Sequence, residues 1–332
     1  MADLTHEFVA QIKEAVAQKS PLIIEGSGSK RWYGNAVAGQ RTLSTAGHIG
    51  ILDYDPAELV LTARAGTTIA ELEKALAERG QMLPFEPPHY SPESTLGGVI
   101  AAGLSGPARP YAGGVRDFVL GLHIIVGKGD VLKFGGQVMK NVAGYDVSRL
   151  MAGSLGVLGL MTQVSLKVLP VPLAQSTLCF ELSEVAAIHQ INEWSAKPLP
   201  MTGSVWHQGI LSVRLAGARA AVASAEQQLG GTKLAPEAAA KLWLDLQDQT
   251  HAFFCSASAM VGQSSLWRMS LPAIAPAIDA ALIPGAQDQL IEWGGAQRWV
   301  RTQSIALPAI REWARAEGGH ASVFRGDATE AE

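Results

Sequence analysis

Apolar residues recur at helical spacing near the start of the chain and then crowd into a short continuous run. The first helix is predicted from apolar residues that share one face, namely Phe8, Val9, Ile12 and Val16. Pro21 ends this helix, because proline cannot continue one. The apolar run at 22–24 predicts a buried strand, which leads into a loop of glycine and serine at 26–30.

Alternation of apolar and polar residues predicts further strands in the first half of the chain. Residues 49–65 alternate in this way and are interrupted by a turn at Asp55-Pro56. Thr67 or Thr68 is placed to cap a helix that ends near Gly80. Two more strand signals follow, a β-hairpin over 119–134 and a strand over 160–169.

The second half changes character after a linker at Pro170-Val171-Pro172, where alanine and glutamine become frequent. Strand signals alternate there with helical signals, at 178–182, 185–194, 211–215 and 218–229. That order is typical of a compact α+β domain. The linker and the length of 332 residues predict two domains, 1–172 and 173–332.

Residues 94–121 are unusually rich in glycine, and most of their other side chains are small. An interior helical glycine costs about 0.5–1 kcal/mol relative to alanine, so a helix built only for packing would not favour this composition. One interpretation is a large ligand lying against bare backbone; the other is a loop packed tightly on its own core. Ser94 or Thr95 can cap a helix start, whose free N–H groups would then face a phosphate.

The loop Gly-Ser-Gly-Ser-Lys at 26–30 has the composition of a phosphate-binding turn. It follows a predicted strand, and consecutive backbone N–H groups beside a lysine attract anions. It does not fit the dinucleotide-binding fingerprint, because Arg31 stands where the third glycine is needed. A nicotinamide-binding enzyme is therefore disfavoured, and an ordinary glycine–serine turn is the alternative interpretation.

Composition excludes several classes of function. The formal net charge of −4 argues against a nucleic-acid partner. Cys179 and Cys255, the two cysteines, cannot hold an iron–sulfur cluster or a cysteine-rich zinc site by themselves. The start of the chain lacks the apolar core of a secretory signal, and no apolar run is long enough to span a bilayer. We expect a cytoplasmic protein.

Six short segments occur in the order found in one group of flavoproteins. They are GSGSK (26–30), PFEPP (84–88), STLGGVIAAGLSG (94–106), GVRDFVLG (114–121), KNVAGYD (140–146) and GSLGVLG (153–159). On these motifs, residues 20–172 resemble the FAD-binding domain of the vanillyl-alcohol-oxidase/PCMH superfamily. The resemblance implies an α+β protein, with a PCMH-type FAD-binding domain of two subdomains followed by an α+β cap domain.

Segments of the second half narrow the resemblance to the smaller FAD-binding subunits of bacterial glycolate oxidase complexes. They are PLPMTGSVW (198–206), LWRMSLP (266–272), IEWGGAQRW (291–299) and GGHASVF (318–324). The resemblance implies an FAD-dependent oxidoreductase subunit that takes part in oxidising glycolate, a small 2-hydroxy acid, to glyoxylate. It also implies two partners, a larger flavin subunit and an iron–sulfur subunit that receives the electrons, with peripheral contact to the inner membrane through the complex left open. A non-catalytic flavin subunit for assembly or electron relay is the alternative.

The resemblance further implies where FAD binds. The first loop would lie on the diphosphate, through Gly26, Ser27, Gly28 and Ser29, with Lys30 nearby. The flavin and its ribityl chain would be lined by Thr95, Leu96, Gly97, Gly98, Gly103, Ser105 and Gly106. The adenosine side would be held by Gly156, Gly159 and Leu160. The first loop contains no histidine, so FAD is expected to be bound non-covalently.

The catalytic groups are not identified by the resemblance. Related 2-hydroxy-acid dehydrogenases carry an H-x-G-D-G-x-x-H-like segment whose histidines serve metal and substrate; this chain has no such segment, and no metal site is expected. The candidates that the residues offer are His89, Lys140 and Tyr145. The chain also ends at Glu332 without the C-terminal segment that usually returns to the flavin domain, so a shortened cap domain is expected.

Overall fold

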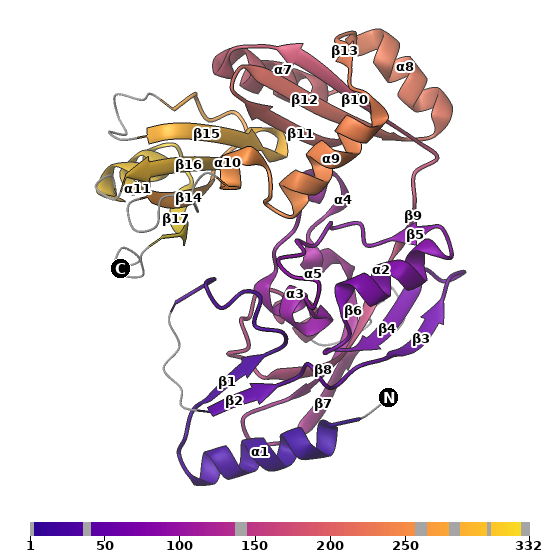
Figure 1. The fold of residues 1–332 in the computed structure, drawn as a ribbon, viewed down its shortest axis with the longest axis vertical. Helices are drawn as coiled ribbons and strands as arrows, with labels where there is room; N and C mark the ends of the chain where they lie inside the picture. Colours follow the sequence, from indigo (N-terminus) through magenta and orange to yellow (C-terminus); the bar gives the residue numbers. More distant parts are fainter. Residues whose placement is uncertain are drawn as a thin grey trace. The chain divides into compact units, whose positions relative to one another are not determined.

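The computed structural model describes residues 3–35, 41–136, 145–255, 264–278, 286–303 and 307–326. The chain divides into two compact units (Figure 1). The first unit consists of Met1–Gly106 and Gly113–Val171, and the second of Pro107–Ala112 and Pro172–Glu332. Both units combine helices with mainly antiparallel sheets, so the expected α+β class is confirmed.

The first unit contains short helices and strands in mixed order. Its helices are α1 (Thr5–Ala17), α2 (Ile69–Ala77), α3 (Leu96–Ala102), α5 (Val115–Phe118) and α6 (Val147–Leu150). Its strands are β1 (Leu22–Glu25), β2 (Arg41–Ser44), β3 (Ile51–Asp55), β4 (Val60–Arg64), β5 (Gln81–Met82), β6 (Val119–Ile125), β7 (Val131–Gly135), β8 (Leu160–Lys167) and β9 (Leu169–Pro170).

Two sheets of the first unit matter for the site. Within the described residues, five strands form an antiparallel sheet in the order β3-β4-β8-β6-β7, while β1 and β2 form a parallel pair. The main core joins the sheet to apolar residues of α2 and α3, among them Ile69, Leu72, Leu96 and Ile100. A smaller core lies under α1, which runs beside β1 and β2 in Figure 1.

The predicted first helix and hairpin are both present. Phe8 and Ile12 are buried in the smaller core, whereas Val16 in the last turn of α1 is 59% exposed. Strands β6 and β7 pair in the predicted antiparallel hairpin. Its turn closes through a hydrogen bond from the Val126 N–H to the Asp130 carbonyl, and Gly129 takes the left-handed φ of +80° that the turn requires.

The second unit is built on one large sheet. Its helices are α4 (Arg109–Ala112), α7 (Glu184–Ser195), α8 (Arg219–Leu229), α9 (Pro236–Gln247), α10 (Ala252–Cys255), α11 (Leu307–Ala316) and the 3-10 turn η1 (Trp293–Gly295). Its strands are β10 (Ala174–Glu181), β11 (Met201–His207), β12 (Ile210–Gly217), β13 (Thr232–Lys233), β14 (Ser264–Ser270), β15 (Ala286–Glu292), β16 (Gln297–Gln303) and β17 (His320–Arg325). Over the described residues, the strand order is β13-β10-β12-β11-β15-β16-β14-β17.

The short segment 107–112, which the sequence analysis assigned to the first domain, packs in the second unit. The Arg109 guanidinium lies over the Trp293 ring at 4.5 Å from its centroid. The Tyr111 hydroxyl is 3.3 Å from the Ser204 Oγ, and burial raises the pKa of this phenol. These contacts, rather than sequence position, decide to which unit the segment belongs.

No helix in the described part of the chain is both long enough and apolar enough to cross a membrane.

Candidate functional site

The loop at 26–30 follows β1 and presents a row of unused hydrogen-bond donors. Within the described residues, none of the backbone N–H groups from Gly26 to Lys30 donates a hydrogen bond. Gly28 has a left-handed φ of +73°, which turns the chain here and which side chains disfavour. Ser27 is exposed and the rest of the loop is half-buried. Consecutive unpaired N–H groups in a bent loop form a concave site for an anion.

Lys30 adds a positive charge to this loop without a counter-ion among the described residues. Its Nζ lies 3.4 Å from the Ser29 Oγ and 5.6 Å from the centroid of the Tyr90 ring. Burial lowers the pKa of Lys30 to about 8, because the ammonium loses hydration. The neighbouring Arg31 is occupied: its guanidinium forms two hydrogen bonds to the Glu25 carboxylate, at 2.8 and 2.6 Å.

The loop packs directly against the start of α3. A Cβ atom on Gly26 would lie 2.1 Å from the Thr95 Oγ1, so only glycine fits at this approach. The Ser29 and Ser94 hydroxyls are 3.2 Å apart. The Thr95 side chain caps α3 by accepting the Gly98 N–H at 3.3 Å, as the sequence predicted. The first loop and the glycine-rich stretch, 65 residues apart at Ser29 and Ser94, therefore form one surface.

The N–H groups at the start of α3 are already used, contrary to the sequence-based expectation. The Leu96 N–H donates to the Thr67 carbonyl at 2.8 Å, and the Gly97 N–H donates to the Ala65 carbonyl at 2.7 Å. The Gly98 N–H is taken by Thr95. The accepting carbonyls lie in the turn that follows β4, so tertiary contacts satisfy the donors that an isolated helix start would leave open.

The two adjacent glycines of α3 have different surroundings. A Cβ on Gly97 would lie 2.9 Å from the Ala65 Cβ, so this glycine allows the helix to pack closely on β4. A Cβ on Gly98 would meet just the Thr95 Oγ1, at 3.1 Å, and Gly98 is half-buried. Packing within the protein therefore accounts for Gly97 but leaves Gly98 with open space beside it.

Close packing also accounts for the glycines that follow α3. Gly103 ends the helix with a left-handed φ of +65°, and a Cβ there would lie 3.0 Å from Gly153 backbone atoms. A Cβ on Gly106 would lie 2.7 Å from the Glu86 carbonyl oxygen. The Ser105 hydroxyl accepts the Val115 N–H at 3.2 Å.

The loop at 153–159 runs beside β1 and carries exposed apolar side chains. Gly156 faces Ile24 of β1, to which a Cβ would be 3.6 Å distant. The side chains of this loop that remain exposed are Leu155 (46%), Val157 (83%) and Leu158 (46%). Ser154 has a buried hydroxyl without a hydrogen-bond partner among the described residues. An apolar surface thus lies next to the donor-rich first loop.

Two predicted site residues have side chains in the core rather than on this surface. Leu96 is fully buried among the residues under α2 and α3, and Leu160 is 1% exposed in the core under α1. Gly159 lies against β6, because a Cβ there would be 2.9 Å from the Ile125 carbonyl oxygen. Any contact that Leu96, Gly159 or Leu160 makes with a ligand would have to use backbone atoms.

Of the three candidate catalytic residues, the structure describes His89 and Tyr145. The His89 Nε2 is 3.0 Å from the Glu73 Oε2 of α2. Tyr145 is 94% exposed. Lys140 lies outside the described residues.

Aromatic residues that the sequence analysis did not select brace the first loop. The Trp32 Nε1 donates to the Ser29 carbonyl at 3.2 Å. The Trp32 ring packs edge-on against Tyr90, with centroids 5.1 Å apart, and Tyr90 also lies under Lys30. The signal available in the sequence was two aromatic residues next to glycine-rich segments, but their pairing across 58 positions could not be read from spacing.

The segment 291–299 of the second unit is also polar, but its groups are matched internally. Glu292 is 4% exposed, and its carboxylate accepts the Trp299 indole N–H at 2.7 Å and the Gln297 amide at 3.2 Å. Arg298 is fully buried, and its guanidinium donates to the carbonyls of Ala275, Pro276 and Gly295. Burial lowers the pKa of Arg298.

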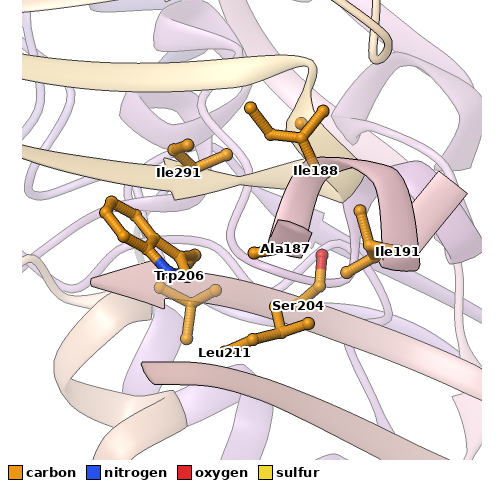
Figure 2. Close-up of a pocket in the computed structure, with 9 residues that line it drawn as sticks. Ala187, Ile188, Ile191, Ser204, Trp206, Leu211 and Ile291 are labelled. Carbon is orange, nitrogen blue, oxygen red and sulfur yellow. The ribbon is translucent and has the colours of Figure 1, made fainter. Parts of the chain in front are cut away.

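A pocket in the second unit is too small to be a ligand site. Helix α7 and strand β11 both contribute to its lining, and Figure 2 labels Ala187, Ile188 and Ile191 of the helix with Ser204 and Trp206 of the strand. The pocket is lined by Ala187, Ile188, Ile191, Ser204, Val205, Trp206, Leu211, Ile291 and Gly295. Its volume of about 10 Å³ is at the lower limit for a single water molecule. Among the described residues, no group of three or more histidine, cysteine or acidic side chains could hold a metal ion.

This chain matches known sequences, one of them over nearly its whole length. The family described as "FAD binding domain" matches residues 2–135. Glycolate oxidase subunit GlcE of Escherichia coli (strain K12) is 48% identical over 322 residues, which cover 97% of this chain and 87% of that protein. Glycolate oxidase subunit GlcD of Bacillus subtilis (strain 168) is 31% identical over 185 residues, or 55% of this chain and 39% of that protein.

A solved structure shows the same fold at low sequence identity. Alkyldihydroxyacetonephosphate synthase superposes with a TM-score of 0.69 and 16% identity, covering 95% of this chain and 69% of that one. The superposition confirms the expected fold class, and the match to an FAD-binding domain family confirms the resemblance of the motifs. With 48% identity over nearly the whole chain, the protein belongs to the family of the glycolate oxidase subunit GlcE and is an FAD-binding oxidoreductase.

Proposed function

We propose that this chain is the FAD-binding subunit of a glycolate oxidase complex and takes part in the oxidation of glycolate to glyoxylate. The single observation that carries the proposal is the 48% identity to a protein named glycolate oxidase subunit GlcE over 97% of this chain. The similarity to a GlcD subunit and to D-lactate dehydrogenases supports a small 2-hydroxy acid as substrate. A larger flavin subunit is the proposed partner, with an iron–sulfur subunit as electron acceptor.

The first unit supplies groups that suit the parts of FAD. The donor row at Gly26–Lys30 and the uncompensated charge of Lys30 match a diphosphate. The exposed apolar side chains of the 153–159 loop suit the flat ring of adenine. Gly98, whose Cβ position is approached by the Thr95 Oγ1 alone, at 3.1 Å, would let the cofactor approach α3. Because the 26–30 loop contains no histidine, we propose that FAD is held non-covalently.

The proposed division of labour follows from these positions. Residues 1–172 would hold FAD, and residues 173–332 would form a cap domain. When bound, FAD would accept a hydride from the α-carbon of the hydroxy acid. This chain's own contribution would be to bind the cofactor through backbone donors, to neutralise its diphosphate and to fix its orientation on α3.

A second role, as a flavin subunit without its own substrate chemistry, is favoured by the surroundings of the candidate catalytic groups that the structure describes. Oxidation of a hydroxy acid needs a base near the hydroxyl and a cation for the carboxylate. Of the candidates that the structure describes, His89 is held by Glu73 and Tyr145 is almost fully exposed, so these two side chains do not supply such a pair. In this case the larger flavin subunit would carry out the chemical step.

The test is to purify the chain alone and with its candidate partners, and to record flavin content and glycolate-dependent bleaching without oxygen. One FAD per chain that acid precipitation releases into the supernatant is the expected result for cofactor binding. A chain without FAD, or with flavin retained in the pellet, contradicts that part of the proposal. Bleaching that needs the larger flavin subunit favours the second role, whereas bleaching of the lone chain favours a catalytic one.

A further inference from the structure

Lys30 differs from three arginines of the first unit in having no acid beside it among the described residues. Arg31 pairs with Glu25, Arg41 with Glu14, and Arg64 with Asp3. Among the described residues, Lys30 contacts just the Ser29 hydroxyl and the Tyr90 ring. A hydroxyl and an aromatic face stabilise an ammonium but do not cancel its charge. The loop therefore holds a half-buried cation whose matching anion is not supplied by the described chain.

The surroundings of Lys30 penalise its charged form. Loss of hydration is the cause that lowers its pKa to about 8, and no described charge contributes to that shift. The groups that face it are the Tyr90 ring and the Ser29 hydroxyl, with Ser94 bonded behind Ser29. Arg31, next along the chain, has its guanidinium on Glu25 and is largely exposed. An anion placed at the loop would be the first opposite charge to favour the protonated form of Lys30.

We propose that cofactor binding at the 26–30 loop is coupled to protonation of Lys30, so that the loop holds a diphosphate tightly only while Lys30 carries its proton. The inference rests on the proposed function, since it takes the diphosphate of FAD as the anion. In the coupled step, a proton from solvent adds to the neutral Nζ of Lys30 as the dinucleotide binds. Lys30 is then a positioning residue for the cofactor and makes occupancy sensitive to pH.

Proton linkage predicts opposite pH dependences for the FAD affinity and for the stability of the free protein. Above pH 8 the free protein loses the Lys30 proton while the complex keeps it, so the affinity for FAD falls as pH rises. The stability of the free protein moves the other way. Its unfolded chain binds the Lys30 proton up to a pKa near 10.4, so the free energy of unfolding rises between pH 8 and 10.

The experiment measures FAD affinity of flavin-free protein at pH 7, 8 and 9. Between pH 7 and 9 the wild-type affinity is expected to fall about tenfold. Calorimetry at pH 8 in two buffers of different ionisation enthalpy should detect uptake of about half a proton per FAD. Lys30→Arg keeps the charge throughout and should bind with a flat pH profile. Lys30→Met removes the charge and should bind at least tenfold more weakly at pH 7, also with a flat profile.

The outcomes separate this inference from the proposed function. Tight FAD binding by the wild-type protein with no pH dependence overturns the coupling and leaves the function standing. A wild-type pH profile that persists in Lys30→Arg also overturns it, because another group would then titrate. Failure of the wild-type protein to bind FAD at any pH overturns the proposed function itself. Urea unfolding of flavin-free Lys30→Met shows whether weak binding reflects the lost charge or a lost fold.

Discussion

The first loop and the segment 291–299 are both polar and, apart from the exposed Ser27, half-buried or buried, yet their hydrogen bonds are arranged in opposite ways. At Gly26–Lys30 the backbone donors have no acceptor and Lys30 has no acid within the described residues. In the second unit, the buried Glu292 carboxylate meets two donors, and the buried Arg298 guanidinium meets three carbonyls. Both regions are rich in polar groups, and they differ in whether those groups have hydrogen-bond or ion-pair partners among the described residues.

The difference separates a binding surface from a structural network. A buried polar group without a partner costs about 1–3 kcal/mol, so a chain keeps such groups where something else completes them. A matched network holds its own segments together and leaves little for a ligand. We therefore propose ligand binding at the first loop and a structural role for Glu292 and Arg298, and the predictions below test the two sides of this comparison.

Arg298→Met is expected to have the largest effect on stability. It removes the donor for the carbonyls of Ala275, Pro276 and Gly295, and the free energy of unfolding should fall by about 3–5 kcal/mol. Arg219→Met, at an exposed position in the first turn of α8, is the matched control and should change it by less than about 0.5 kcal/mol. Equal urea midpoints for the two variants would contradict a structural role for Arg298.

Gly26→Ala should damage both the fold and the cofactor site. The added Cβ would lie 2.1 Å from the Thr95 Oγ1, so either the loop or the cap of α3 must move. We expect a loss of about 1–3 kcal/mol in unfolding free energy and at least a tenfold loss in FAD affinity. Gly127→Ala, where no atom lies within 4 Å of the added Cβ, should leave both quantities unchanged. A fully flavinated Gly26→Ala protein would contradict the close approach of loop and helix.

Gly98→Val should affect FAD binding without unfolding the protein. Its side chain would project into open space beside Thr95, so the flavin-free fold should keep its stability to within about 1 kcal/mol. FAD content should fall well below one per chain, and Gly98→Ala should give an intermediate value. Stoichiometric flavin in Gly98→Val would mean that the space beside α3 is not used by the cofactor.

Asp3→Asn should have the smallest effect, visible in acid. Hydrogen bonds from Thr5, and the nearby Arg64, lower the pKa of Asp3 to about 2. A lowered pKa contributes stability above the unfolded value near 3.9, and this contribution is lost as pH falls through about 2. Because Asp3 is mostly exposed, screening limits the effect to at most about 1 kcal/mol. Urea midpoints at pH 6 and pH 3 should differ less in the variant than in the wild-type protein; an unchanged difference would exclude this linkage.

Several elements of the fold could be predicted from local patterns in the sequence. The helix with Phe8 and Ile12 inward, the Thr95 cap and the β6–β7 hairpin all follow from spacing and turn chemistry, which act over a few residues. The family motifs extended this to the fold and the cofactor. The cofactor-site residues themselves stay a proposal.

What the sequence could not provide depends on contacts between distant segments. No local pattern in the sequence shows that the carbonyls of Ala65 and Thr67 accept hydrogen bonds from the backbone N–H groups of α3. Within the described residues, the backbone N–H groups of the first loop have no such acceptors. Likewise, Lys30 and Arg31 are adjacent cations that the sequence does not distinguish. The structure shows that Glu25 neutralises Arg31, whereas no described acid neutralises Lys30. The motif IEWGGAQRW indicated a family in the sequence analysis. Its role in a buried hydrogen-bond network follows from the structure, in which the Trp299 indole N–H donates to the Glu292 carboxylate.

Hydrogen–deuterium exchange at single-residue resolution, with and without FAD, tests the comparison most directly. The account predicts that amides 26–30 exchange rapidly in the free protein and become protected when FAD binds, because the diphosphate then accepts their hydrogen bonds. The amides of Leu96 and Gly97, bonded to Thr67 and Ala65 in the free protein, should be protected in both states. Amides 26–30 that exchange equally fast with bound FAD would contradict the assignment of this loop as the cofactor cradle.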